Sequence, residues 1–526
     1  MFDLAHEAFA KHGDSFFLEE SGGVLLVSKA LLEKRHKDIQ KKEQSLYEQR
    51  QEALEVAKQR VFEEANEEIS ALVAQLQTPA TFSLTPALPN ETILLTDQTT
   101  VTLSNIEISS QLFLVLLEKT RVTVGESFSI AEHTDNEDCI RESGMARNSP
   151  FRLERQGVVS NFALENIKRI PPSSIGCSLK EVGLTETDLI NILPKLRIHK
   201  DSKVGWFIVT AAEKEHVGPI LAQGQTLYVG RVKKIALGGY AVSIVVNLRT
   251  NEDLEVEDLI LDSTGKEHVA AVLEQEKPFC VGRVKDITLG GYAVSIFPKL
   301  GIRKHYKLRE LWLNASEEEN VSAIPTQYKT ICVERVKNIN ILDYAAGILP
   351  KLIIHEDCEV ELLNLSANRK EHVAAVLEQE KMFCVERVKN MRLCGYAVSV
   401  ISKMSIHEDY RVENLKMYAE KEEHVAAVLA QGQTICVGRV KNMGLWGYAA
   451  NILPKMRIHE DNIMEEFVLT AAREHYSRIF GEEDNSIELR KIRRDGFDVP
   501  SGTKKKLRYT LVDGRGKEVE ENFFFF

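Results

Sequence analysis

The sequence contains no apolar run that approaches the ~20 residues required by a membrane-spanning helix; the best run is residues 112–117. Its first residues, 1–6, lack the basic patch and apolar core of a secretory signal. Hydrophobic residues make up 44% of the 526 positions and charged residues 28%, which is ordinary for a globular protein. We therefore expect a cytoplasmic protein without a membrane segment.

Motifs for metal binding and catalysis are also missing. The eight cysteines include no Cys-x-x-Cys pair, and four of them recur every 52 residues, which indicates a packing position rather than a disulfide framework or a zinc site: Cys280, Cys332, Cys384 and Cys436. No nucleotide-binding loop, nucleophile elbow or paired-carboxylate site is recognisable. The sequence predicts a protein that is not an enzyme and needs neither metal nor cofactor.

Basic residues are too few for a general polyanion binder, because the net charge is −11 and affinity for phosphate chains rests on Lys and Arg. The exception is the C-terminal segment, residues 489–526, with ten Lys or Arg against six acids. Two interpretations of this basic tail stay open: attraction to nucleic acid, or a solvated end of the chain.

What the chain does contain is a tandem repeat of 52 residues. Val229, Val281, Val333, Val385 and Val437 each open a Val-Gly/Glu-Arg-Val-Lys segment, and a degenerate copy precedes them, so that six copies fill residues 177–488. A fixed period of this length indicates one supersecondary unit that is copied along the chain. We expect its function to be repeated at fixed positions, which argues against a single catalytic constellation.

The region before the repeats has three parts. Residues 1–77 are predicted as a helical arm, because 28–77 contain no Pro or Gly and carry an apolar stripe. That helix is either a coiled coil, through which the protein forms a homo-oligomer, or an amphipathic helix that folds back on its own domain. Residues 78–89 hold three prolines and are predicted as a linker. β-branched runs in 90–176 predict a small β-rich domain.

Within one repeat, the pattern predicts three strands and a helix. Residues 330–339 alternate as a strand does, a turn at Gly291 or its equivalents follows, and Ala-Val-Ser-Ile reads as a second strand. A third short strand ends in Ile-His, and residues 370–377 are typical of the closing helix. The predicted fold class is α+β, mainly β in the repeats: six strand-strand-strand-helix units after a long helix and a small β-rich domain.

The repeat resembles a known RNA-binding module. Gly282-Arg-Val-Lys-Asp-Ile-Thr288, the glycine turn, Val294-Ser-Ile296, the Ile-His pair and Gln431-Gly-Gln433 are similar to the S-one RNA-binding domain. That domain is the five-stranded OB barrel repeated in the large small-subunit ribosomal protein that handles messenger RNA. The resemblance covers residues 177–488 and implies OB-like units, single-stranded RNA as partner and a role related to translation. It also implies that three Ile-His histidines lie near the RNA-facing surface: His355, His407 and His459.

The candidate RNA-binding residues form a basic ladder, two residues per repeat: Arg231 and Lys233, Arg283 and Lys285, Arg335 and Lys337, Arg387 and Lys389, and Arg439 and Lys441. Residues two apart on a strand share a face, so five copies could follow a phosphate backbone. Alternatively, each pair makes cross-strand ion pairs with acids such as Glu356, Asp357, Glu460 and Asp461. The repeats carry no net basic charge, which favours the second interpretation.

Two functions follow from these patterns. The first is a non-enzymatic RNA-binding protein with tandem OB-like repeats. The second is a repeat scaffold that mediates protein–protein interaction.

Overall fold

The structure is a computed structural model that describes residues 9–519 apart from 21, 32–33, 35–36, 38–75, 77, 134–136, 144–149, 200, 225, 250–254, 302–306, 325–330, 355–357, 386 and 407–409. The chain divides into two compact units. Unit 1 comprises residues 1–234 and 247–251, and unit 2 comprises residues 235–246 and 252–526. The division falls inside strand β17 (Arg231–Gly239).

Unit 1 begins with a four-stranded antiparallel sheet. Its strands are β1 (Ala10–His12), β2 (Ser15–Glu20), β3 (Gly23–Ser28) and β5 (Ile93–Thr96), in the order β1-β2-β3-β5. Strand β3 is the core of this sheet, since Val24, Leu25, Leu26 and Val27 are all buried. The first described residues of the predicted helical arm are therefore strands, and β3 pairs with β5 from beyond the predicted linker.

The rest of unit 1 is built mostly from parallel strands, the antiparallel pair of β10 with β7 being the exception in the sheets below. One sheet has the order β4-β6-β8, with β4 (Thr81–Leu84), β6 (Thr100–Leu103) and β8 (Arg121–Val124). A second has the order β10-β7-β9-β12-β14, with β10 (Ile140–Glu142), β7 (Ile106–Ser109), β9 (Phe128–Ala131), β12 (Ile175–Cys177) and β14 (Leu196–Ile198). Strands β11 (Phe151–Gln156), β13 (Leu179–Thr185) and β15 (Lys203–Ala211) pair in parallel.

The helices α4 (Ser110–Lys119) and α5 (Asn161–Arg169) each begin at a serine cap. The side chains of Ser109 and Ser160 accept hydrogen bonds from backbone N–H groups of the first turn, which otherwise have no partner. The buried Asn166 then ties α5 to the segment after α4, because its amide donates to the carbonyls of Leu117 and Thr120.

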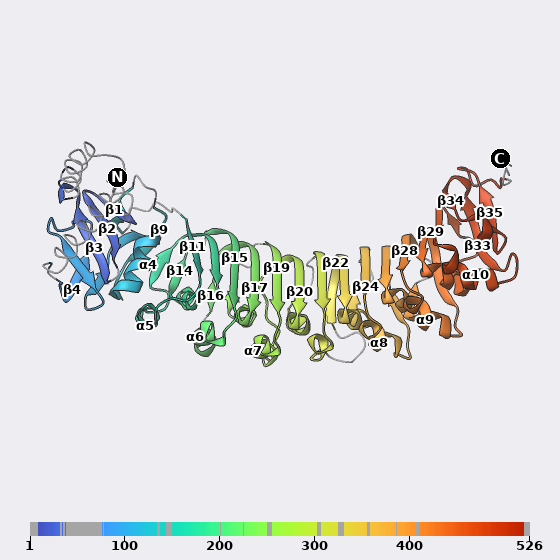
Figure 1. Ribbon diagram of the computed structural model, residues 1–526, viewed down its shortest axis with the longest axis horizontal. Coiled ribbons are helices and arrows are strands. Elements are labelled where there is room, and N and C mark those ends of the chain that lie inside the picture. Colours follow the sequence, from blue (N-terminus) through green and yellow to red (C-terminus); the bar gives the residue numbers. More distant parts are fainter. Residues whose placement is uncertain are drawn as a thin grey trace, which may run out of the picture. The chain divides into compact units, whose positions relative to one another are not determined.

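Unit 2 is built on one parallel sheet, whose strands lie side by side in Figure 1. In order they are β19 (Glu255–Ser263), β20 (Arg283–Gly291), β21 (Lys307–Ala315), β22 (Ile331–Asp343), β24 (Val360–Ala367), β26 (Val388–Gly395), β28 (Arg411–Ala419), β29 (Ile435–Gly447), β32 (Glu466–Thr470) and β34 (Phe497–Asp498). Each strand is followed by a helical or irregular return, so every coil adds one strand to the sheet.

Each 52-residue period contains two such coils. Strand residues Arg283, Lys307 and Arg335 occupy equivalent positions 24 and 28 residues apart, as the pairing of Lys307 with Arg335 shows. The long strands bury apolar residues at the same spacing, as Val284, Ile287 and Leu289 do in β20 and Leu308, Leu311 and Leu313 do in β21. A coil of 24 or 28 residues that adds one strand and one return is typical of solenoid repeats.

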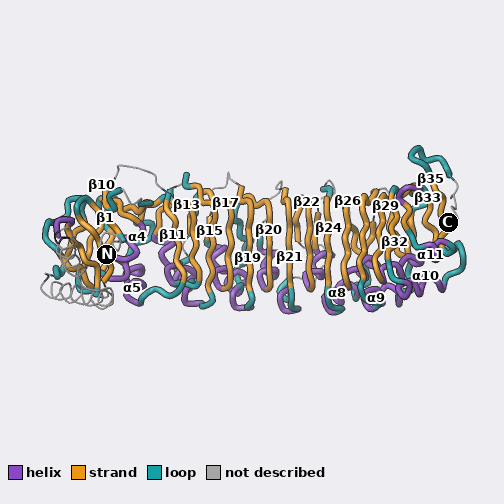
Figure 2. The backbone as a smooth tube through the Cα atoms, turned by 45° about the horizontal axis from the view of Figure 1, so that its top comes forward, coloured by secondary structure: helices purple, strands orange, loops and turns teal. Residues whose placement is uncertain are grey.

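The return segments alternate between two types and cover one side of the sheet, as the purple segments of Figure 2 show. The first type is a 3₁₀ helix that opens with tyrosine: η3 (Tyr240–Val246), η5 (Tyr292–Lys299), η7 (Tyr344–Lys351), η8 (Tyr396–Lys403) and η9 (Tyr448–Lys455). The second type is a short helix: α7 (Ala270–Leu273), α8 (Glu371–Leu377) or α9 (Glu423–Ala430). Both types bury their apolar residues against the sheet.

A lysine at the end of the 3₁₀ helix joins the two types of return. Lys455 donates to the carbonyls of Val428, Leu429 and Gln431 at the C-terminal end of α9. Lys299 and Lys403 donate in the same way to the carbonyls of Gln275 and Gln379. Gln275, Gln379 and Gln431 lie just beyond the ends of α7, α8 and α9, where carbonyls have no partner from a further helical turn. A cation also suits the negative end of the helix dipole.

The predicted fold class is wrong in three respects. The repeats are not strand-strand-strand-helix OB-like barrels, because their long strands join one parallel sheet. Ala-Val-Ser-Ile forms the 3₁₀ helix rather than a second strand, and the second long strand of each period, such as β21 or β28, was missed. Residues 90–176 do not form a separate small β-rich domain, since β11 and β12 pair with β13 and β14 of the first repeat.

No long N-terminal helix is present among the described residues. Most of the predicted helix, residues 28–77, lies outside the described part of the chain. Some predicted features are confirmed, because a short strand ends in Ile-His at β14 and at β30 (Met456–Ile458), and α8 begins at Glu371. The C-terminal segment forms β33 (Ile487–Arg493), β34 and β35 (Leu507–Val512).

None of the described helices combines the length and apolar character that crossing a membrane requires.

We call a strand that precedes a tyrosine 3₁₀ helix a first-type strand and the other long strands second-type strands. The turn after each first-type strand requires a backbone conformation that favours glycine. Gly291, Gly395 and Gly447 have φ of +55°, +63° and +62°. A Cβ atom at Gly447 would lie 2.3 Å from the carbonyl oxygen of Ala419 in the preceding coil. Asp343 is the exception: it adopts φ 54°, and its carboxylate lies 2.8 Å from Nδ1 of the buried His372.

We expect Gly447→Ala to destabilise unit 2 by about 1–3 kcal/mol, because a side chain is strained at this φ and meets the Ala419 carbonyl. Gly432→Ala is the matched control, since a Cβ there meets nothing within 4 Å and its φ is not positive. The denaturant midpoint of the full chain, followed by circular dichroism, measures the difference. Equal midpoints for the two variants would contradict the proposed strain.

Candidate interaction surface

The outer face of the unit 2 sheet is formed by alternate strand residues. In β28, Asn414, Lys416 and Tyr418 alternate with the buried Leu415 and Met417. Successive strands pair in register, so equivalent side chains form rows across the sheet. The return segments lie on the other side of the strands (Figure 2). The outer face is therefore a continuous surface to which many coils contribute side chains.

The structure places the basic ladder at the beginnings of the first-type strands: Arg231 and Lys233 on β17, Arg283 and Lys285 on β20, Arg335 and Lys337 on β22, Arg387 and Lys389 at β26, and Arg439 and Lys441 on β29. The second-type strands β24 and β28 have glutamates at the lysine position, so that Glu361 and Glu413 alternate with Lys337, Lys389 and Lys441. Strand β21 differs, since it has Arg309 there, which pairs with Asp286. The register therefore puts opposite charges side by side.

The ladder lysines have carboxylate partners. Lys337 lies 3.1 Å from Glu361, and Lys441 lies 3.4 Å from both Glu413 and Glu465. Lys389 pairs with Glu359. In unit 1, Arg231 lies 3.5 Å from Asp201. The structure thus forms cross-strand ion pairs, as the second interpretation of the ladder expected, although mostly with acids other than those named from the sequence.

The ladder arginines differ from the lysines. Arg335, Arg387 and Arg439 make no ion pair among the described residues, and Arg387 is exposed with φ 47°. Arg411 lies opposite Arg439 in the register and donates to the carbonyl of Ile463. These arginines follow the edge where the strands begin, away from the middle of the outer face.

The two described Ile-His histidines lie in turns that follow short strands. His459 follows β30, and its Nδ1 accepts a hydrogen bond of 3.2 Å from the backbone N–H of Asp461. His199 does the same with Asp201 in unit 1. The histidine thus stabilises a tight turn between strands. His355 and His407 lie outside the described residues.

Asparagine side chains form hydrogen-bonded rows across the outer face. Asn442 donates to Asn414 (3.0 Å), and Asn414 donates to Asn390 (2.5 Å). In a second row, Asn364 donates to Asn340, which donates to Glu310. A side-chain amide has both a donor and an acceptor, so identical residues at the strand spacing continue the row. These rows hold the outer face in one arrangement.

The outer face also carries a group of aromatic residues that the sequence analysis did not predict. The rings of Tyr418 and Trp446 stack with centroids 4.4 Å apart and an interplanar angle of 7°. The guanidinium of Arg392 lies 5.1 Å from the centroid of Tyr418. Trp312, on β21, is 37% exposed. These residues lie on different coils, so no short motif in the sequence brings them together.

Along the return segments, tyrosine and histidine rings pack in pairs. Tyr240 with His268, Tyr344 with His372, Tyr396 with His424 and Tyr448 with His475 have centroids between 4.1 and 4.6 Å apart. The Nδ1 atom of His268 accepts the N–H of Gly265, and the side-chain oxygen of Asn320 accepts that of Glu317 at the equivalent position. These histidines cap and pack, as a structural role requires.

Burial lowers the pKa of His424. The positive charge of Lys421 lowers this pKa further, whereas Glu420 and Glu423 act in the opposite direction. The neutral imidazole is therefore the form that fits this site.

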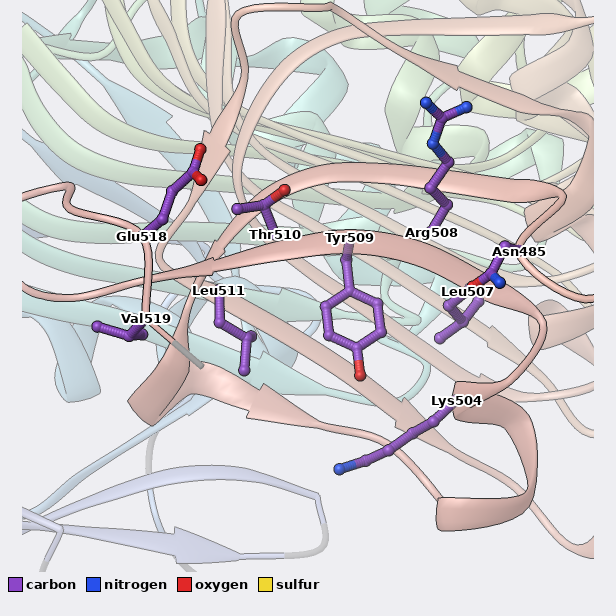
Figure 3. A pocket seen from close by; sticks show the side chains of 9 residues that line it. All are labelled: Asn485, Lys504, Leu507, Arg508, Tyr509, Thr510, Leu511, Glu518 and Val519. Carbon is purple, nitrogen blue, oxygen red and sulfur yellow. The ribbon is translucent and has the colours of Figure 1, made fainter. Parts of the chain in front are cut away.

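A hollow of about 490 Å³ lies beside β35, the last strand of the three-stranded sheet β31-β33-β35, where β31 is Ile463–Met464. Figure 3 shows Arg508 and Thr510 on one side of this strand and Tyr509 and Leu511 on the other. Lys504 lies 5.6 Å from the centroid of Phe497, which packs on Tyr509. Several cations of the predicted basic tail are paired, such as Lys506 with Asp484 and Arg493 with Glu465.

Among the described residues, no three His, Cys, Asp or Glu side chains gather to hold a metal ion. No protein-family model, curated protein or solved structure matches the chain.

We expect Asn414→Ala to destabilise unit 2 by about 1–2 kcal/mol, because it removes the hydrogen bonds to both Asn390 and Asn442. Asn338→Ala is the matched control, since Asn338 occupies the same row and makes no side-chain hydrogen bond among the described residues. Denaturant unfolding of the full chain compares the variants. A loss of the same size in both would mean that the row adds nothing to stability.

We expect His424→Asn to weaken the acid sensitivity of the fold. Because the folded-state pKa of His424 is lowered, its contribution to stability is complete above the unfolded pKa of about 6.5 and declines as the pH falls below it. Asparagine does not titrate and already occupies this position at Asn320. Denaturant midpoints between neutral and mildly acidic pH should fall less steeply for the variant, and parallel profiles would refute the assignment.

Proposed function

We propose that the outer face of the unit 2 sheet is a docking surface for protein partners and that the chain is a non-enzymatic repeat scaffold. The observation that carries this proposal is how the copies differ from one another. Positions that face the core hardly change, as in Val284, Val336, Val388 and Val440, or in Leu289, Ile341, Leu393 and Leu445. The sheet thus needs the same apolar residues in every copy.

Outer-face positions of the same strands change freely from copy to copy. One position holds Thr288, Asn340, Arg392 and Gly444, and the other holds Gly290, Leu342, Cys394 and Trp446. The basic ladder, by contrast, keeps its arginine and lysine throughout. A face that varies on a constant framework can present a different chemical character at each coil, and repeat solenoids offer such extended surfaces for binding.

The composition of the face also favours a protein partner. Trp446, Tyr418, Trp312 and Arg392 are of the residue types that contribute most of the binding energy at protein interfaces. Side chains that are already aligned by the asparagine rows lose little conformational freedom on binding.

Binding of single-stranded RNA stays a prediction, and two features of the fold argue against it. The resemblance implied separate barrels, whereas the repeats share one sheet. Lys337, Lys389 and Lys441 already have carboxylate partners, so a phosphate would have to compete with them. A role in translation, a cytoplasmic location and oligomerisation through residues 28–77 likewise stay predictions.

A binding test separates the two sides of the sheet. Short random peptides displayed on phage are selected on the immobilised full chain, and the dissociation constants of the enriched peptides are measured by fluorescence anisotropy. We expect Asn364→Glu, on the outer face of β24, to weaken binding roughly tenfold or more, because it puts a longer, charged side chain into the surface.

Ala375→Glu is the matched control, since it adds the same side chain to an exposed position of helix α8. It should leave binding unchanged, and circular dichroism confirms that both variants fold. Peptides lost on Ala375→Glu but retained by Asn364→Glu would place binding on the helical side and overturn the proposal. Salt-sensitive binding of an oligouridine probe without any peptide binding would support the RNA prediction in its place.

A further inference from the structure

Arg392, Tyr418 and Trp446 form a row across three neighbouring strands, β26, β28 and β29. The guanidinium of Arg392 covers one face of the Tyr418 ring at 5.1 Å, and the indole of Trp446 stacks on this tyrosine at 4.4 Å. A Cβ atom at Gly444 would lie 2.1 Å from Cη2 of Trp446. The indole therefore lies over Gly444, in space that is open because this position has no side chain.

Two cations at this row are uncompensated, Arg392 itself and Lys416. Both are exposed, and they lie directly opposite each other in the register of β26 and β28. Neither has a carboxylate within ion-pair distance in the described part of the chain, whereas Lys389 on β26 and Lys441 on β29 do. Like charges placed opposite each other destabilise a sheet, so a bound anion would relieve a cost that the free protein carries.

The extent of this positive patch limits what it can bind. In the register of Arg392 and Lys416, the flanking residues are Asn364 on β24 and Val468 on β32, so the patch ends at uncharged side chains on both sides. The three strands between them span roughly 10–15 Å. A polynucleotide that continued across the strands would meet no further cation at these two positions, and stacking of a base on Tyr418 is blocked because Arg392 and Trp446 already contact its ring.

We propose that Arg392, Lys416, Tyr418 and Trp446 form a binding site for a short acidic peptide segment of a partner protein. Carboxylates of the segment pair with Arg392 and Lys416, and an apolar side chain beside them packs on the part of Trp446 that Tyr418 leaves uncovered. This inference rests on the proposed docking function of the outer face and specifies the chemistry of one partner. Arginine and tryptophan adjacent to each other provide both charge complementarity and apolar contact.

The experiment uses the peptide selection on the full chain, followed by a charge reversal. Peptides enriched on the native chain are expected to be rich in Asp and Glu next to an aromatic or large apolar residue. Their dissociation constants are then measured against Arg392→Glu combined with Lys416→Glu, and separately against Trp446→Ala. We expect roughly tenfold or more weaker binding in both cases, and a steep loss of affinity with added salt for the native chain.

Arg369→Glu combined with Lys370→Glu is the control, because it reverses the same number of exposed charges just before helix α8, off the outer face. This control should bind like the native chain. Far-ultraviolet circular dichroism and melting confirm that each variant folds. The Trp446→Ala variant keeps the charges, so it separates a built site from general attraction of acidic peptides.

Three outcomes overturn the inference. Enriched peptides without acidic residues, or acidic peptides that bind the charge-reversed chain as well as the native one, remove the site. If those peptides still lose affinity on Asn364→Glu, the outer face remains a docking surface and only this site fails. Binding of an oligouridine probe that depends on Arg392 and Lys416, with no acidic peptide enriched, assigns the patch to nucleic acid instead.

Discussion

The parallel register between successive coils is the constraint on which the rest of unit 2 depends. Each strand satisfies its backbone hydrogen bonds with the strands before and after it, so the coils must keep the same rise and orientation. The close approach of coils explains why Gly395 and Gly447 lie opposite Ala367 and Ala419, whose carbonyl oxygens occupy the space of a side chain. It also explains why core positions repeat with so little change, since any difference in volume would be felt by both neighbouring coils.

The same register decides the electrostatics. From β22 to β32, one coil of each period supplies a lysine and the next supplies a glutamate, so charges that are far apart in the chain become neighbours in the sheet. A ladder of cations read along the sequence is therefore a row of alternating charge in the structure. Exposed pairs of this kind stabilise a fold only slightly, but they penalise any shift of register, because a displaced strand would place like charges together.

Sequence reasoning recovered the period and the helix at Glu371, because both depend on local patterns that survive in every copy. It failed on the number of coils per period. Leu308, Leu311 and Leu313 repeat the spacing of Val284, Ile287 and Leu289, yet the intervening returns differ so much that two coils looked like one unit. The Ala-Val-Ser-Ile segment was wrongly predicted as a strand for a different reason. Its β-branched residues favour strands, but the positive φ of Gly291 directs the chain off the sheet. Pro298 then suits a short 3₁₀ helix. The stack of Tyr418 on Trp446 was beyond reach, since it requires knowing which strands are neighbours.

Departures from the repeat are of two kinds. Some repair the fold locally: Asp343 replaces the turn glycine and pairs with His372, and Asn320 replaces a capping histidine while keeping the hydrogen bond. Other departures repair nothing. Arg392 and Lys416 add a like-charge contact, and Trp446 places an indole where other copies have glycine, leucine or cysteine. Arg392 and Lys416 thus lower the stability of a regular framework, and no described residue near them offsets that loss. A bound partner is what would offset it.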